Sequence, residues 1–76
     1  MVDHVESYGG EEYVVRRVTG SAATKPYRCP GCSQQIRPAT PHVVAWPVVP
    51  SMFHDEGIDE RRHWHTPCWT ARDRRR

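Results

Sequence analysis

Three cysteines and one histidine are spaced along the chain as two half-sites for a metal ion. The first half-site is Cys29-Pro30-Gly31-Cys32 and the second is His65-Thr66-Pro67-Cys68. Three thiolates and one imidazole form a common ligand set for structural zinc. The two half-sites use every cysteine of the chain, which favours a metal site over scattered free thiols. We therefore predict one structural zinc ion bound by Cys29, Cys32, His65 and Cys68.

Local sequence around each half-site suits this role. Gly31 can adopt a positive φ, which would turn the backbone so that both sulfurs of the first half-site face one point. In the second half-site, Thr66 is expected to cap a helix and Pro67 to occupy its first turn. His63 also lies near Cys68, but its spacing does not fit a ligand pair. His42 and His54 have no partner at ligand spacing, so we expect them on the surface or in loops.

A chain of 76 residues has room for one domain with a thin core, which makes a metal an important source of stability. Zinc binding to finger peptides is worth about 10–16 kcal/mol at neutral pH, so removing zinc should unfold the protein. An odd number of cysteines and a start without a basic or apolar run argue against a secreted, disulfide-bonded protein. No stretch approaches the roughly 18 apolar residues of a membrane helix, and we expect a cytoplasmic protein without membrane contact.

Composition favours strands over helices. The chain has no Leu, but it has nine Val and two Ile, and β-branched residues pack well in sheets. Residues 1–12 carry four acidic side chains and end near two glycines, so we expect a disordered acidic head. The remaining residues, 13–76, are expected to form a single zinc-finger domain with a basic tail. Its expected strands are residues 13–18, 26–28, 42–46 and 61–64, followed by a short helix over residues 67–74.

The order of these elements predicts the fold class. A metal-binding turn precedes a β-hairpin made by residues 42–46 and 61–64, and a helix then carries the last two ligands. This is the order of a treble clef, here a small zinc-stabilised α+β fold with an extra N-terminal strand. Ten of the eleven basic residues are Arg, which together with abundant Val, Ala and Pro suggests a high-GC genome such as that of an actinobacterium.

The ligand motifs also carry a resemblance to a known family. Cys29-x2-Cys32-Ser33-x2-Ile36, followed by Trp64-His65-x2-Cys68-Trp69, resembles the poly(ADP-ribose) polymerase-type zinc finger, which has three cysteines, one histidine and a gap of roughly thirty residues. The chain also looks like small actinobacterial zinc-finger proteins labelled "ATP/GTP-binding". It has no Gly-rich loop followed by Lys and Ser or Thr, so we expect no nucleotide cofactor.

The resemblance implies recognition of DNA breaks by an apolar loop and basic side chains. Met52 and Phe53 lie in the comparable long loop, although Phe53 could instead cover the loop's own small core. Arginine pairs well with phosphates, and aromatic side chains stack on bases. The net charge of +2 is too small to indicate nucleic-acid binding by itself. The candidate DNA- or RNA-binding residues are Arg28, Arg37, Met52, Phe53, Arg61, Arg62, Arg72, Arg74, Arg75 and Arg76.

Two other function classes remain to be weighed. A protein-interaction adaptor is the alternative, with Trp46, Trp64 and Trp69 forming an apolar patch and the acidic segments suiting a basic partner. Against that patch, Trp64 and Trp69 adjoin ligands and could instead shield the zinc. An enzyme is not expected, because four protein ligands leave a zinc ion without an open position for water, and the chain has no Asn for a nuclease site of the HNH type.

Overall fold

The computed structural model describes residues 3–50 and 57–74. Within them, four antiparallel strands form the main sheet in the order β1-β2-β5-β6, and two short strands form a separate ribbon. The main-sheet strands are β1 (Asp3–Tyr8), β2 (Glu11–Val18), β5 (His42–Pro47) and β6 (Arg62–Trp64). The ribbon strands are β3 (Tyr27–Arg28) and β4 (Gln35–Ile36). The one α-helix of the described residues is α1 (Thr66–Thr70), with single 3-10 turns at Gly20–Ala22, Gly57–Glu60 and Arg72–Arg74.

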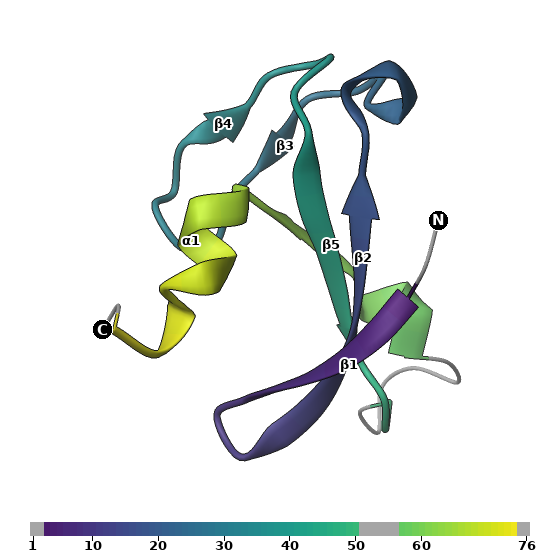
Figure 1. The fold of residues 1–76 in the computed structure, drawn as a ribbon, viewed down its shortest axis with the longest axis vertical. Coiled ribbons are helices and arrows are strands. Elements are labelled where there is room, and N and C mark those ends of the chain that lie inside the picture. The colour runs from purple at the N-terminus through teal and green to yellow at the C-terminus, as the bar shows by residue number, and fades with distance from the viewer. Residues whose placement is uncertain (1–2, 51–56, 75–76) are drawn as a thin grey trace.

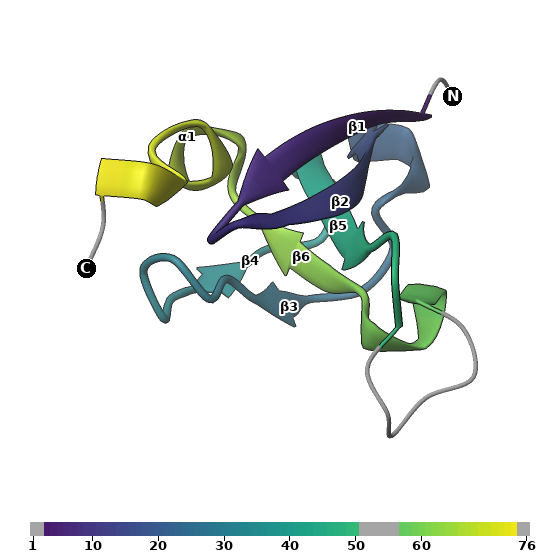
Figure 2. The ribbon, with the colours of Figure 1, turned by 90° about the horizontal axis from the view of Figure 1, so that it is seen from below.

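The helix and the ribbon lie on the same side of the main sheet, to the left of β5 in Figure 1. In Figure 2, strands β3 and β4 lie below β6, and α1 lies above them. The molecule is therefore a small α+β fold with antiparallel sheets and a short helix near the C-terminus, as the sequence predicted at this coarse level.

The N-terminal segment differs from its prediction. Residues 3–12 were expected to be disordered, but they form β1 and the start of β2. Gly9 and Gly10 both have positive φ, 62° and 81°, and Tyr8 pairs with Glu11. Two consecutive residues of positive φ make a tight hairpin turn whose twist matches that of paired strands. The glycines therefore form a turn that pairs two strands, and residues 3–12 form ordered strands with this turn where we expected a disordered acidic head.

Other predicted elements are found with small shifts. The strand expected at residues 42–46 is β5, and β6 pairs with it so that Val43 lies opposite Trp64. The expected helix over residues 67–74 begins one residue earlier and ends at Thr70, after which the chain continues as a 3-10 turn. Ribbon strand β4 was not expected.

The buried core lies between the main sheet, the ribbon and the helix. Ile36, expected beside the metal-binding turn, has no exposed surface. Two predicted ligands belong to this core, so metal binding and apolar packing share the same interior. The buried cluster consists of Val15, Cys29, Ile36, Val43, Ala45, Trp64, Cys68 and Trp69.

Candidate metal centre

The four predicted ligands converge on one point. Cys29 follows β3, Cys32 lies in the ribbon turn, His65 follows β6, and Cys68 lies in the first turn of α1. Their ligand atoms all lie within 4.8 Å of one another. The Nδ1 atom of His65 is 3.4 Å from the Cys32 Sγ and 4.0 Å from the Cys68 Sγ. A tetrahedral site with Zn–S and Zn–N bonds of about 2.3 and 2.0 Å has ligand atoms about 3.5–3.8 Å apart, so this arrangement could hold one metal ion.

Backbone hydrogen bonds shape the turn between the first two ligands. The Cys29 N–H donates to the Gln34 carbonyl at 3.0 Å, and the Ser33 N–H donates to the Cys29 carbonyl at 2.8 Å. Ser33 has the positive φ of this turn, 61°, and not Gly31 as we expected. Gly31 is required for another reason: a Cβ there would lie 3.0 Å from the Cys68 Cβ and 3.2 Å from the Trp64 ring. The missing side chain lets the two half-sites approach each other.

The second half-site forms where β6 passes into α1. His65 occupies the N-cap position, where we had expected Thr66, and Thr66 and Pro67 are in the helix. The His65 side chain makes no capping hydrogen bond, because its Nδ1 faces two of the sulfurs. The Trp69 N–H donates to the His65 carbonyl at 3.0 Å, which places Cys68 in the first turn, on the side of the other ligands.

The electrostatics of the three thiols favour a cation. Burial raises the pKa of Cys29, but hydrogen bonds from the backbone N–H groups of His65 and Cys32 outweigh it and lower the pKa to about 7. Burial raises the pKa of Cys68 to about 11, and the neighbouring thiols Cys29 and Cys32 add to this rise. Neighbouring thiolates repel one another, and a bound metal ion would offset the charge of Cys68 and favour its thiolate form.

Two tryptophans close the apolar side of the centre. Trp64 and Trp69 are 8% and 3% exposed, and their rings meet edge to face with centroids 5.2 Å apart. Their burial agrees with the interpretation that they shield the metal centre. Trp46 is also buried at 9% exposed, with the Arg16 guanidinium 5.1 Å from the centre of its ring. The prediction that the three tryptophans form an exposed patch for an adaptor is therefore wrong.

Sequence comparison identifies the family of this chain. A model of the Rv1322 family matches residues 4–70, a range that includes all four predicted ligands and all of strand β1 except Asp3. The chain belongs to the Rv1322 family. No zinc-finger family is identified among the matches, so the likeness to the polymerase-type finger rests on the ligand motifs.

Members of the Rv1322 family occur in mycobacteria. Proteins of Mycobacterium tuberculosis strain H37Rv and of Mycobacterium bovis are each 54% identical to this chain over 63 residues. The aligned region covers 83% of this chain and 61% of each relative, so the chain spans about three fifths of their length. Both relatives are named as uncharacterised proteins. No solved structure matches the chain.

Four of the predicted nucleic-acid-binding residues lie in or beside strands β3, β4 and β6. Arg28 follows Tyr27 in β3, and Arg37 follows Ile36, the residue that pairs with Tyr27. Arg61 and Arg62 directly precede His63, whose ring stacks on that of Tyr27. All four are exposed, and we call them the knuckle arginines: Arg28, Arg37, Arg61 and Arg62.

Arg72 has a different place from the knuckle arginines. Its guanidinium donates to the Ser7 and Trp69 carbonyls, lies 3.2 Å from the Glu6 carboxylate, and stacks 4.2 Å from the centre of the Trp69 ring. It joins the helix end to β1, so its guanidinium is engaged in intramolecular contacts. The remaining candidates lie outside the described part of the chain: Met52, Phe53, Arg75, Arg76 and the Arg74 side chain.

His42 is a residue whose role the sequence reasoning missed. Expected on the surface, it is 2% exposed and bonded to His63, with its Nε2 atom 2.8 Å from the His63 Nδ1. Its Nδ1 donates to the Thr40 carbonyl at 2.8 Å. All of β5 from His42 to Trp46 is buried. A run buried on both faces does not alternate, so the sequence held no periodic signal that His42 was interior. His54 lies outside the described residues.

The described residues include no helix with the length and apolar character needed to cross a bilayer.

Proposed function

We propose that the chain is a structural zinc module with treble-clef architecture. The observation that carries this proposal is the meeting of three sulfurs and one ring nitrogen, from two segments far apart in sequence, within 4.8 Å. Soft thiolates with one imidazole in a tetrahedral arrangement favour zinc over harder cations. Four protein donors would leave no open position on the metal, which supports a structural role over a catalytic one.

The treble clef is supported by the order of elements around the centre. The ribbon turn provides two ligands, strands β5 and β6 form the hairpin, and α1 follows with the last ligand in its first turn. Each ribbon strand has only two residues, so the ribbon has few hydrogen bonds of its own. A metal joining the ribbon to β6 and α1 would provide most of the stability at this end.

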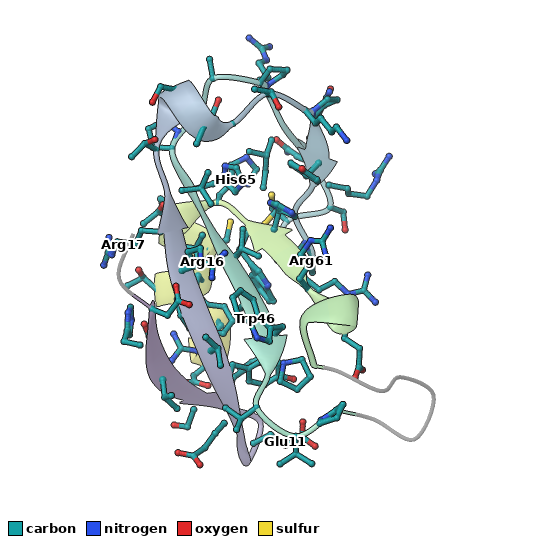
Figure 3. The ribbon with its side chains drawn as sticks, turned by 90° about the vertical axis from the view of Figure 1, so that its right-hand side faces the viewer. Glu11, Arg16, Arg17, Trp46, Arg61 and His65 are labelled. Atoms are coloured by element: carbon teal, nitrogen blue, oxygen red, sulfur yellow. The ribbon has the colours of Figure 1, made fainter. Side chains whose placement is uncertain are left out.

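We further propose that this module binds DNA or RNA through the knuckle arginines. Support comes from their positions in or beside strands β3, β4 and β6 near the metal centre, where guanidinium groups could contact phosphates. Arg28 also donates to the Ser33 carbonyl at 2.9 Å. The acidic residue Glu11 lies at the end of the molecule away from His65, as Figure 3 shows. Arg61 and Arg62 line one hollow with Glu11, Glu12 and Glu60, so Arg28 and Arg37 are the knuckle arginines outside that acidic surface.

Fluorescence anisotropy of the zinc-loaded chain with nicked duplex, intact duplex and single-stranded oligonucleotides, each at two salt concentrations, tests this proposal. Each phosphate contact contributes about 0.9 to the slope of log K against log salt for duplex DNA. Replacing Arg37 and Arg62 together by Gln should therefore reduce the slope by about 1–2. Arg17→Gln is the matched control, because Arg17 is exposed on β2, at the opposite margin of the sheet from Arg61 (Figure 3). Absence of binding at low salt would end the nucleic-acid proposal.

One observation favours the protein-docking alternative. Val48 and Val49 are 45% and 79% exposed and line an open hollow of about 900 Å³. Its charged lining residues are three glutamates and two arginines: Glu11, Glu12, Glu60, Arg61 and Arg62. Exposed apolar side chains beside acidic groups would suit a basic, partly apolar protein segment. Failure of nucleic-acid binding together with binding of such a segment, lost in Val49→Asp, would support this alternative.

A further inference from the structure

Two aromatic rings join the half-sites of the metal centre from outside it. The rings of Tyr27 and His63 are stacked, with centroids 3.4 Å apart and planes inclined by 5°. Tyr27 lies two residues before Cys29, and His63 lies two residues before His65. The stack therefore connects the segments leading into the first ligand of each half-site.

A buried histidine holds this stack in one orientation. The Thr40 carbonyl can only accept a hydrogen bond, so the His42 Nδ1 donates to it. A neutral His42 then has a lone pair at Nε2, which accepts from the His63 Nδ1 at 2.8 Å. Because His42 is 2% exposed and both of its ring nitrogens have partners, it anchors the His63 ring to β5 as a satisfied buried polar group.

The stack of Tyr27 on His63 is important because of where the β3–β4 ribbon lies. Strands β3 and β4 pair with each other but share no hydrogen-bonded ladder with the main sheet, and β3 lies against β6 (Figure 2). Bringing Cys29 to His65 closes a loop of 36 residues, which costs conformational entropy whenever the metal binds to a loose chain. A contact that closes this loop in advance removes that cost from metal binding.

We propose that Tyr27, His63 and His42 form a clasp that holds the two half-sites together before the metal arrives, and thereby sets metal affinity without touching the metal. The inference rests on the proposed zinc site and names three positioning residues for it. Burial of Ile36 and Cys29 in the core also holds the β3–β4 ribbon in place. Loss of the clasp therefore weakens metal binding and does not abolish it.

Competition for Zn²⁺ between the full chain and a chromophoric chelator tests the clasp. Tyr27→Leu, which keeps apolar volume but removes the ring, should lower zinc affinity by about 10- to 100-fold, the range found when groups that orient metal ligands are removed. Tyr27→Phe keeps the ring and should bind zinc nearly as tightly as the parent chain. His42→Phe should resemble Tyr27→Leu, whereas His42→Gln retains an acceptor for His63 and should lose less.

Two controls separate the clasp from a general loss of stability. Gln35→Ala changes an exposed side chain of the same ribbon and should bind zinc like the parent. Val15→Ala removes buried volume from β2, a strand that carries no ligand. The clasp proposal is overturned if Tyr27→Leu binds zinc as tightly as Gln35→Ala does, or if Val15→Ala weakens zinc binding as much as Tyr27→Leu at an equal loss of thermal stability.

Cobalt substitution distinguishes this inference from the zinc proposal itself. The parent chain and Tyr27→Leu should both show Co²⁺ absorption bands characteristic of tetrahedral thiolate coordination, since the ligands are unchanged. Absence of these bands from the parent chain would refute the metal site and the clasp with it. Their presence together with unchanged affinity in Tyr27→Leu would refute the clasp alone.

Discussion

The two ends of this small molecule are held together by different means. The end formed by strands β1 and β2, which we call the hairpin end, is held by four aromatic rings. They meet edge to face or at a tilt, with centroids 5.2–6.1 Å apart: Tyr8, Tyr13, Trp64 and Trp69. At the metal end, strands of two residues surround four ligand atoms. Long strands and large rings bury enough apolar surface to stabilise the first end, whereas the second requires a stronger local interaction.

The two ends also share an interior. Trp64 and Trp69 pack against the hairpin rings and belong to the same buried cluster as Cys29 and Cys68. Damage at the metal end should therefore reach the hairpin. Strands β1 and β2 carry no ligand, so damage confined to the hairpin should weaken the fold but leave the four ligands in place.

Loss of the metal should have the largest effect. Removing zinc with a chelator, or replacing Cys32 or Cys68 by Ala, should remove on the order of 10 kcal/mol of folding free energy and abolish the cooperative thermal transition followed by circular dichroism. Gln34→Ala, an exposed change in the same turn, should retain the transition. A cooperative transition that persists in either cysteine variant would refute structural zinc and show that the hairpin end folds independently.

Loss of the central ring of the hairpin end should have the next largest effect. Trp69→Ala should cost about 3–5 kcal/mol of unfolding free energy in urea, because it leaves a cavity among buried rings, yet Co²⁺ should still show thiolate absorption. Val49→Ala, at a side chain that is 79% exposed, should change stability by no more than about 0.5 kcal/mol. If Trp69→Ala abolished cobalt binding, the two ends could not be treated as separate supports.

The charged contact that joins β1 to the helix should have a smaller, pH-dependent effect. Burial tends to raise the pKa of Glu6, but hydrogen bonds from His4 and Trp69 and the charge of Arg72 outweigh it and lower the pKa below the ordinary value of 4.5. A carboxyl group with a lowered folded-state pKa stabilises the protein above its unfolded pKa, and this contribution disappears as pH falls through the folded-state value.

Glu6→Gln keeps an acceptor for the Trp69 N–H but loses the charge, and should therefore lose about 1 kcal/mol of unfolding free energy at pH 7. The difference between parent and variant in urea unfolding should shrink as pH falls below 4.5. Metal release at acid pH affects both chains, so the difference between them isolates Glu6. A difference that stayed constant down to the lowest pH would mean that the Glu6 charge contributes nothing.

The metal ligands could be recognised from the sequence because ligand spacing is a local property. Cys29 and Cys32 share one turn and His65 and Cys68 share one helix start, so each pair is recognisable without knowledge of the other. The strand β5 was predictable for a similar reason, since neighbouring β-branched residues favour extended structure.

The N-terminal strand was missed because two glycines indicate either a linker or a tight turn, and pairing partners decide between them. The acidic residues expected to be solvated include Glu6, which instead accepts a hydrogen bond from Trp69 at 3.0 Å across 63 positions of sequence. No local pattern predicts a contact of that separation.

The sequence by itself therefore determined which four side chains can bind a metal, that strands predominate, and that a short helix follows the last β-strand. Only the tertiary structure decided that Tyr27 stacks on His63, that His42 is interior, and that Arg72 is held against β1 whereas the knuckle arginines are exposed. The physical reason is that ligand spacing and strand propensity act between near neighbours, whereas these contacts depend on strand register and on how the ribbon packs against the sheet.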